Sequence, residues 1–247
     1  MMLKIEALPK LSKQDIKENI NSHCIPKHPA RVLFNGSSGS GKSNLIISML
    51  TRPEFYLNYF DYVFILSPNF DRDDSYRHID KLIAKQQRTK KGTIFQTYEK
   101  YDAEEMSQII AELNEAVEKL PKSKRKRVLF LLDDILEDKA LLNSSFLSLL
   151  FTRGRHLNAS IWFSTQSYKS TPRKMRLQLT DIILFEPRNL SEKKMIYEEF
   201  SAGLAPDMFD AIISVVFSKP FQFLVIRPNQ TDKKRKLSMC FEHWIEF

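Results

Sequence analysis

Short apolar runs alternate with amphipathic stretches from residue 30 to the end of the chain. Runs that are apolar throughout are typical of parallel strands buried on both faces of a sheet. Strands are predicted over residues 31–35, 62–67, 93–97, 128–132, 160–165, 181–185 and 221–226. Residues 237–244 predict an antiparallel strand at the edge of the sheet. The pattern indicates an α/β fold whose mostly parallel sheet is covered by helices on both faces.

The clearest helix follows Asp102. Apolar residues recur there three or four positions apart from Met106 to Leu120, which places them on one helical face. Asp102 and Glu105 form a capping pair at the start, and Pro121 ends the helix. Further helices are predicted over 141–150, after residue 41, over 77–85 and 192–200, and from about residue 206.

Composition limits the class of protein. The chain has 247 residues, of which 43% are hydrophobic, so it can bury a core of its own. We expect an N-terminal arm over residues 1–29, with a short helix over 13–20, and a single domain over 30–247.

Two cysteines, Cys24 and Cys240, exclude a disulfide scaffold and fit a reducing compartment. No apolar run approaches the ~20 residues of a bilayer span, and residues 1–10 lack the continuous apolar region of a secretory signal. We therefore expect a soluble intracellular protein.

Three of the six glycines lie in one short segment that matches G-x-x-x-x-G-K-[ST] at every fixed position. An apolar strand precedes the segment and a helical face follows it, which is the geometry that aims backbone N–H groups at phosphate oxygens. Lys42 is expected to reach the β- and γ-phosphates of ATP, and Ser43 to bind Mg²⁺. The expected nucleotide-binding residues are Gly36, Ser37, Ser38, Gly39, Ser40, Gly41, Lys42 and Ser43.

An acidic pair, Asp133 and Asp134, ends the apolar run over 128–132. Such a residue at the tip of a buried strand is the usual second support for Mg²⁺ in phosphate-loop enzymes. We expect Asp133 to bind Mg²⁺ and Asp134 to polarise the attacking water, although a bridging water or Glu137 could share that role. The two acids could also cap the helix that follows. The strands predicted between the phosphate loop and this pair favour the division of motors and helicases, which has an additional central strand, over nucleoside kinases and GTPases.

Polar residues flank the strand over 160–165. Gln166 follows it and is expected near the γ-phosphate, where it could orient water or sense the nucleotide; it could equally be a solvated turn residue. Arg153 and Arg155 precede the strand, which at ~20 Å for six residues is too long for either to reach the phosphate of its own subunit. Either arginine could serve a neighbouring subunit in trans, or simply form a solvated basic turn.

These features together resemble the FtsK–HerA superfamily of DNA-pumping ATPases. Residues 153–156, Arg-Gly-Arg-His, and the Ser-Tyr after Gln166 are most similar to the poxvirus-type genome-packaging ATPases of large DNA viruses and virophages. The resemblance covers residues 30–188. It implies a RecA-like core that forms a homo-oligomeric ring around double-stranded DNA and drives it into a preformed capsid, with contacts to capsid or portal-like vertex components. It also implies Gln166 as sensor, Arg155 as the trans finger, and the host-cell cytoplasm, virus factory or virion as location.

The positive net charge of the chain is consistent with the DNA partner that the resemblance implies. Lys and Arg outnumber Asp and Glu by 38 to 30, a charge of +8, which favours polyanions. Basic runs occur at 88–91, 122–127 and 233–236. The preferred DNA contacts follow Gln166, where a nucleotide-dependent shift could be transmitted: Lys169, Arg173, Lys174 and Arg176. We expect an ATP- and Mg²⁺-dependent DNA-packaging translocase; the alternatives are a helicase or transfer-type DNA ATPase, and a nucleotide-gated scaffold that hydrolyses ATP slowly.

Overall fold

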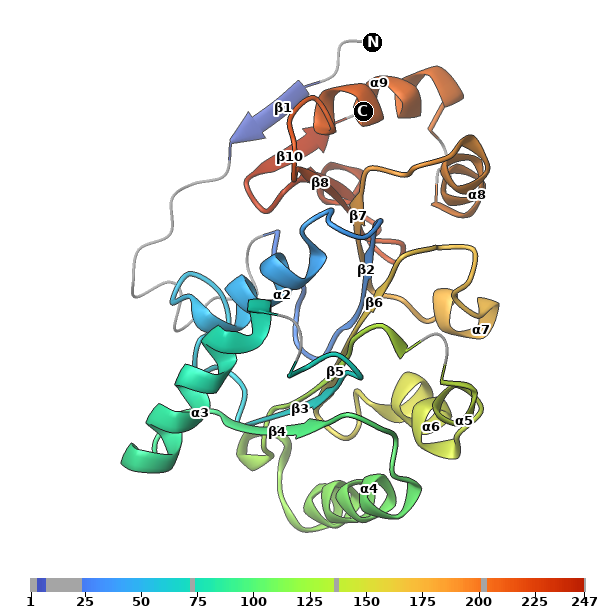
Figure 1. Ribbon diagram of the computed structural model, residues 1–247. Coiled ribbons are helices and arrows are strands. Elements are labelled where there is room, and N and C mark those ends of the chain that lie inside the picture. Colours follow the sequence, from blue (N-terminus) through green and yellow to red (C-terminus); the bar gives the residue numbers. More distant parts are fainter. Residues whose placement is uncertain (1–3, 8–23, 72–73, 136–137, 201–203, 247) are drawn as a thin grey trace. The chain divides into compact units, whose positions relative to one another are not determined.

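A computed structural model describes residues 4–7, 24–71, 74–135, 138–200 and 204–246 (Figure 1). The chain divides into two compact units. Unit 1 contains Val32–Lys42 and Thr165–Phe247 with Met1–Lys27, and unit 2 contains His28–Arg31 and Ser43–Ser164. The helix predicted over 13–20 lies outside the described residues.

Unit 2 contains a parallel group of strands in the order β6-β5-β3-β4. These strands are β3 (Tyr62–Leu66), β4 (Ile94–Tyr98), β5 (Val128–Leu132) and β6 (Ala159–Thr165). Every residue of β5 and β6 is buried, which confirms that both faces of these strands are covered. Every residue of β4 is exposed or half-buried, as expected for a strand at the edge.

The helices of unit 2 begin and end mostly at the predicted signals. They are α2 (Lys42–Thr51), α3 (Arg77–Thr89), α4 (Ala103–Lys119), α5 (Lys139–Leu142) and α6 (Ser145–Arg153), with short 3-10 turns η1 (Asp74–Tyr76) and η2 (Lys122–Lys124). Asp102 accepts hydrogen bonds from the N–H groups of Glu104 and Glu105 at the start of α4. The single helix predicted over 141–150 is wrong, because the Ser144 hydroxyl accepts from the N–H of Leu147 and starts a new helix.

Unit 1 contains strands in the order β2-β7-β8-β9-β10-β1. Its strands are β1 (Lys4–Ala7), β2 (Arg31–Asn35), β7 (Asp181–Phe185), β8 (Phe223–Ile226), β9 (Leu237–Met239) and β10 (His243–Glu246). The β2–β7 pair is parallel, and the remaining pairs are antiparallel. Residues 237–244 form parts of two strands instead of one, because the chain turns at Cys240, whose φ is 50°.

Helices α7 (Arg173–Arg176), α8 (Leu190–Phe200) and α9 (Pro206–Val216) and the 3-10 turn η4 (Lys233–Arg235) complete unit 1. Two helices, α8 and α9, connect β7 to β8, which returns the chain to the sheet at the end where β7 stops. Strand β8 is therefore antiparallel to β7, whereas the sequence placed it among the parallel runs. None of the helices in the described ranges is long and apolar enough to cross a membrane.

Candidate nucleotide site

The phosphate-loop segment lies in unit 1 between β2 and the start of α2. The N–H of Gly36 donates a 3.1 Å hydrogen bond to the carbonyl of Thr165. A Cβ at Gly36 would lie 2.7 Å from the Cβ of Phe185 and 2.7 Å from Oγ of Ser40, so no side chain fits there. Gly41 has a φ of +101°, a conformation that L side chains rarely adopt. Close packing at one end and left-handed backbone at the other explain why the loop needs glycine.

Lys42 begins α2 and folds back over the loop. Its Nζ donates to the carbonyl oxygens of Gly36 at 2.6 Å and Ser37 at 2.9 Å. The first turn of α2 contains no acidic residue that would offset the positive end of the helix dipole. An ammonium group and a helix N-terminus thus serve the same loop, which suits the binding of a phosphate chain.

A second cation reaches the loop from the segment after β7. Nη2 of Arg188 donates a 3.2 Å hydrogen bond to the carbonyl of Ser38. No sequence motif singles out Arg188, because the contact joins residues 150 positions apart.

The acidic pair lies in unit 2 at the end of β5. Asp133 is only 6% exposed; its Oδ2 accepts a 2.7 Å hydrogen bond from the Tyr76 hydroxyl, and its Oδ1 accepts one from the Ser164 hydroxyl. The β5–β6 register pairs Leu132 with Phe163, so Asp133 and Ser164 are the next residues along. Two hydroxyls therefore hold the carboxylate in one orientation.

Asp134 differs from its neighbour. Its side chain is exposed, its φ is 56°, and its N–H donates to Oγ of Ser164 at 3.2 Å. Left-handed backbone is tolerated by aspartate and is common at functional sites. Glu137, the alternative residue for activating water, lies outside the described residues.

The environment of Asp133 fits a divalent cation. Within the described part of the chain this buried carboxylate forms no ion pair, and its partners are the two hydroxyls. A buried charge with no opposite charge is costly. Mg²⁺ prefers oxygen ligands and is commonly held by one or two carboxylates together with phosphate oxygens. Ser43, in the first turn of α2, belongs to the same unit and is half-buried.

Gln166 follows directly after Thr165, the residue whose carbonyl accepts from Gly36 in unit 1. Its side chain is exposed at the carboxyl end of β6. This position is next to the phosphate loop, and the sensor role stays a prediction.

The turn with the two arginines lies before β6, at its other end. Arg153 ends α6, and both Arg153 and Arg155 are exposed. A Cβ at Gly154 would lie 2.5 Å from the carbonyl oxygen of Leu150, so the turn can start this tightly only at glycine. Burial, and then the positive charge of Arg155, lower the pKa of Arg31, whose Nη1 donates to the carbonyl of Phe151 at 2.7 Å.

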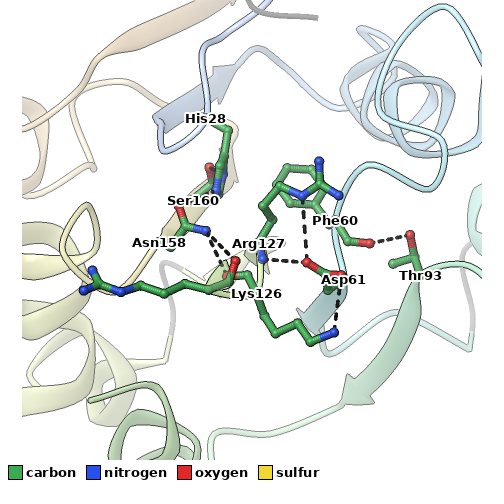
Figure 2. Close-up of polar contacts among 9 residues, drawn as sticks. His28, Phe60, Asp61, Thr93, Lys126, Arg127, Asn158 and Ser160 are labelled. Atoms are coloured by element: carbon green, nitrogen blue, oxygen red, sulfur yellow. Dashed lines mark hydrogen bonds and ion pairs between the residues drawn. The ribbon is translucent and has the colours of Figure 1, made fainter. Parts of the chain in front are cut away.

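Asn158 closes this turn and ties it to other segments of unit 2 (Figure 2). Its backbone is left-handed, with a φ of 55°. Its amide donates to the carbonyls of Lys126 at 3.0 Å and Arg125 at 3.3 Å, and its oxygen accepts from Nε2 of His28 at 3.2 Å. Nδ1 of His28 is 2.7 Å from Oγ of Ser160. The position of the arginine turn is thus fixed by a buried polar cluster.

The four expected DNA contacts do not share one environment. Lys169, Arg173 and Lys174 are exposed. The side chain of Arg176 is only 9% exposed; it forms an ion pair with Glu199 at 3.0 Å and lies over the ring of Tyr168 at 5.1 Å. Arg176 therefore differs from the solvent-facing cation that the sequence indicated, because its charge is paired with Glu199 inside unit 1.

Comparison with known proteins identifies the family. The profile of the family described as poxvirus A32 protein matches residues 17–199, more than half of the chain. The chain belongs to the poxvirus A32 family. This match confirms the poxvirus part of the resemblance drawn from the sequence. A search of curated proteins finds no significant match.

Solved structures show the same fold as this member of the A32 family. The DNA-packaging ATPase B204 from Sulfolobus turreted icosahedral virus has a TM-score of 0.58 at 17% identity, covering 86% of this chain and 97% of that chain. The genome packaging NTPase B204 from Sulfolobus turreted icosahedral virus 2, in complex with AMP, has a TM-score of 0.56 at 17% identity, covering 85% and 96%. The likeness confirms the predicted α/β phosphate-loop fold.

Proposed function

We propose that this chain uses ATP hydrolysis to move double-stranded DNA into a preformed viral capsid. Membership of the A32 family supports the proposal. So does the likeness to B204 of Sulfolobus turreted icosahedral virus, described as a DNA-packaging ATPase, and to B204 of Sulfolobus turreted icosahedral virus 2, described as a genome packaging NTPase and solved with ATP-γS. The observation that carries the nucleotide part is the glycine loop at the start of α2, with the Lys42 ammonium folded over its carbonyl groups.

The proposed chemistry is attack of water on the γ-phosphate. The loop and Lys42 would bind the phosphates, and Ser43 and Asp133 would hold Mg²⁺. When bound, Mg²⁺ neutralises charge on the phosphate oxygens. Asp134 would polarise the attacking water, and Gln166, beside the loop, would sense the nucleotide.

The partners belong to the same proposal. A homo-oligomeric ring would let the exposed Arg155 serve the nucleotide of a neighbouring subunit. Duplex DNA would contact the exposed cations Lys169, Arg173 and Lys174 through its phosphates, without reading sequence. Capsid or portal-like vertex components would receive the DNA, in the host-cell cytoplasm or virus factory.

The deciding experiment is steady-state ATPase activity with and without duplex DNA. We expect DNA to stimulate the wild type, and Lys42→Ala to lower activity by about a hundredfold or more, since one preorganised donor to the transition state is lost. Lys194→Ala, at an exposed lysine of α8, is the control and should behave as wild type. ATPase activity that is the same with and without duplex DNA would favour the scaffold alternative. Displacement of an annealed strand would favour a helicase.

A further inference from the structure

A cavity of about 600 Å³ opens beside the phosphate loop within unit 1. Its walls are Ser37, Gly39 and Ser40 of the loop, residues 185–188 after β7, and residues 217–222 before β8. Small-molecule sites commonly have volumes of roughly 300–1,000 Å³. The cavity is therefore large enough for the part of a nucleotide that the loop itself does not hold.

Phe221 is the unusual residue of this wall. Its side chain is 71% exposed, which leaves a large apolar ring facing solvent. Its φ is 63°, and a bulky residue in the left-handed region is a true outlier. Such backbone persists where the surrounding structure holds it, often at ligand sites. The ring is next to the loop, because its Cδ1 lies 3.4 Å from where a Cβ of Gly41 would be.

The rest of the cavity offers polar groups. Arg188 already contacts the loop through the carbonyl of Ser38. Oγ of Ser40 and Oε1 of Gln222 are buried and have no hydrogen-bond partner among the described residues. Buried polar atoms in native proteins are usually satisfied, but these two have almost no accessible surface, so the accessible cation of the wall, Arg188, is the polar group that a ligand can reach.

We infer that this cavity binds the base and ribose of the nucleotide, with the Phe221 ring stacked on the base. The inference rests on the proposed function, since the loop must hold the phosphates for the base to reach the cavity. Aromatic rings stack on every nucleobase through their faces. The exposed Phe221 ring and the Arg188 guanidinium would then contact the same ligand, an aromatic base with its sugar.

The test compares Mg²⁺ complexes of a nonhydrolysable ATP analogue and of inorganic tripolyphosphate, which has phosphates but no base. Removal of a stacking ring costs about 1–3 kcal/mol per base, so Phe221→Ala should weaken the analogue roughly tenfold and leave tripolyphosphate unchanged. Phe221→Trp should restore binding of the analogue. Leu177→Ala, at a side chain that is 62% exposed and does not line the cavity, is the matched control.

Lys42→Ala separates this inference from the proposed function, because it should weaken both ligands. Wild-type affinity of Phe221→Ala for the analogue, with Lys42→Ala still defective, would overturn the base site alone. Equal weakening of both ligands by Phe221→Ala would also overturn it, since the ring would then act on the loop. Wild-type affinity of Lys42→Ala for both ligands would overturn the proposed function and this inference together.

Discussion

The Tyr76 hydroxyl donates a 2.7 Å hydrogen bond to Oδ2 of Asp133 across 57 positions of the chain. Tyr76 is 1% exposed and ends η1, so the contact comes from outside the strands that flank the acid. With the Ser164 hydroxyl on the other oxygen, it sets the direction in which the carboxylate can bind a cation.

Tyr76→Phe removes that hydroxyl and keeps the ring. We expect the Mg²⁺ concentration for half-maximal ATPase activity to rise several-fold, and the free energy of unfolding to fall by about 1.5–3 kcal/mol for a hydrogen bond to a charged group. Tyr98→Phe is the control, since its hydroxyl bonds Gln96 and Glu105 on an exposed surface. A Mg²⁺ titration identical to wild type would contradict an orienting role for Tyr76.

Gly36→Ala should be costlier than Gly39→Ala. A Cβ at Gly36 meets the Cβ of Phe185 and Oγ of Ser40, both at 2.7 Å, and overpacking typically costs about 1–3 kcal/mol. At Gly39 the space is open, and the cost is about 1 kcal/mol for a side chain at a φ of +74°. Urea denaturation measures both, and a costlier change at Gly39 would show that the loop packs differently.

Arg176→Ala and Arg173→Ala are expected to change different properties: the first the stability of the fold, the second the binding of DNA. Arg176→Ala leaves Glu199 without its ion-pair partner and should lower the free energy of unfolding by about 2 kcal/mol or more. Arg173→Ala should leave the free energy of unfolding unchanged. It should make the slope of log K for duplex binding against log salt concentration shallower by about 1, as expected for the loss of one phosphate contact. Binding of fluorescent duplex DNA across a salt series checks this, and an unchanged slope for Arg173→Ala would remove it from the DNA surface.

Arg155→Ala should lose at least about tenfold in ATPase activity if the arginine acts in trans. Mixing it with Lys42→Ala should restore part of the activity, because one variant supplies an intact loop and the other an intact arginine. Arg153→Ala tests the neighbouring candidate in the same assay. Wild-type activity of Arg155→Ala alone would exclude the trans role.

The burial of His28 should make the free energy of unfolding fall in acid. Burial lowers the pKa of His28 to about 4, with the charge of Arg127 acting in the same direction. The unfolded chain, with an ordinary pKa near ~6.5, takes up the proton first, so stability is lost as the pH falls from 6.5 towards 4. Relative to His28→Gln, the wild type should lose about 2 kcal/mol between pH 7 and pH 5 in urea denaturation. A pH-independent difference would contradict this.

Local features were predictable because they depend on neighbouring residues. The apolar runs predicted the bounds of β2, β5 and β7 correctly, and Asp102 predicted the start of α4. The environment of Arg176 and the bond from Tyr76 to Asp133 were not predictable, since each depends on residues brought together only by the fold. The cavity wall at Phe221 was missed for the same reason: an isolated phenylalanine in a sequence does not reveal its φ or its exposure.

The Asn158 side-chain amide joins its own turn to two other segments of unit 2, which lie 130 and 32 positions away along the chain. The arginine turn is therefore held by hydrogen bonds near the starts of β5 and β6 as well as by its covalent connection to α6. A pull on Arg155 by a neighbouring molecule would be transmitted into the buried strands as mechanical load. The hydrogen bonds of Asn158 thus couple the position of this turn to the residues that precede β5.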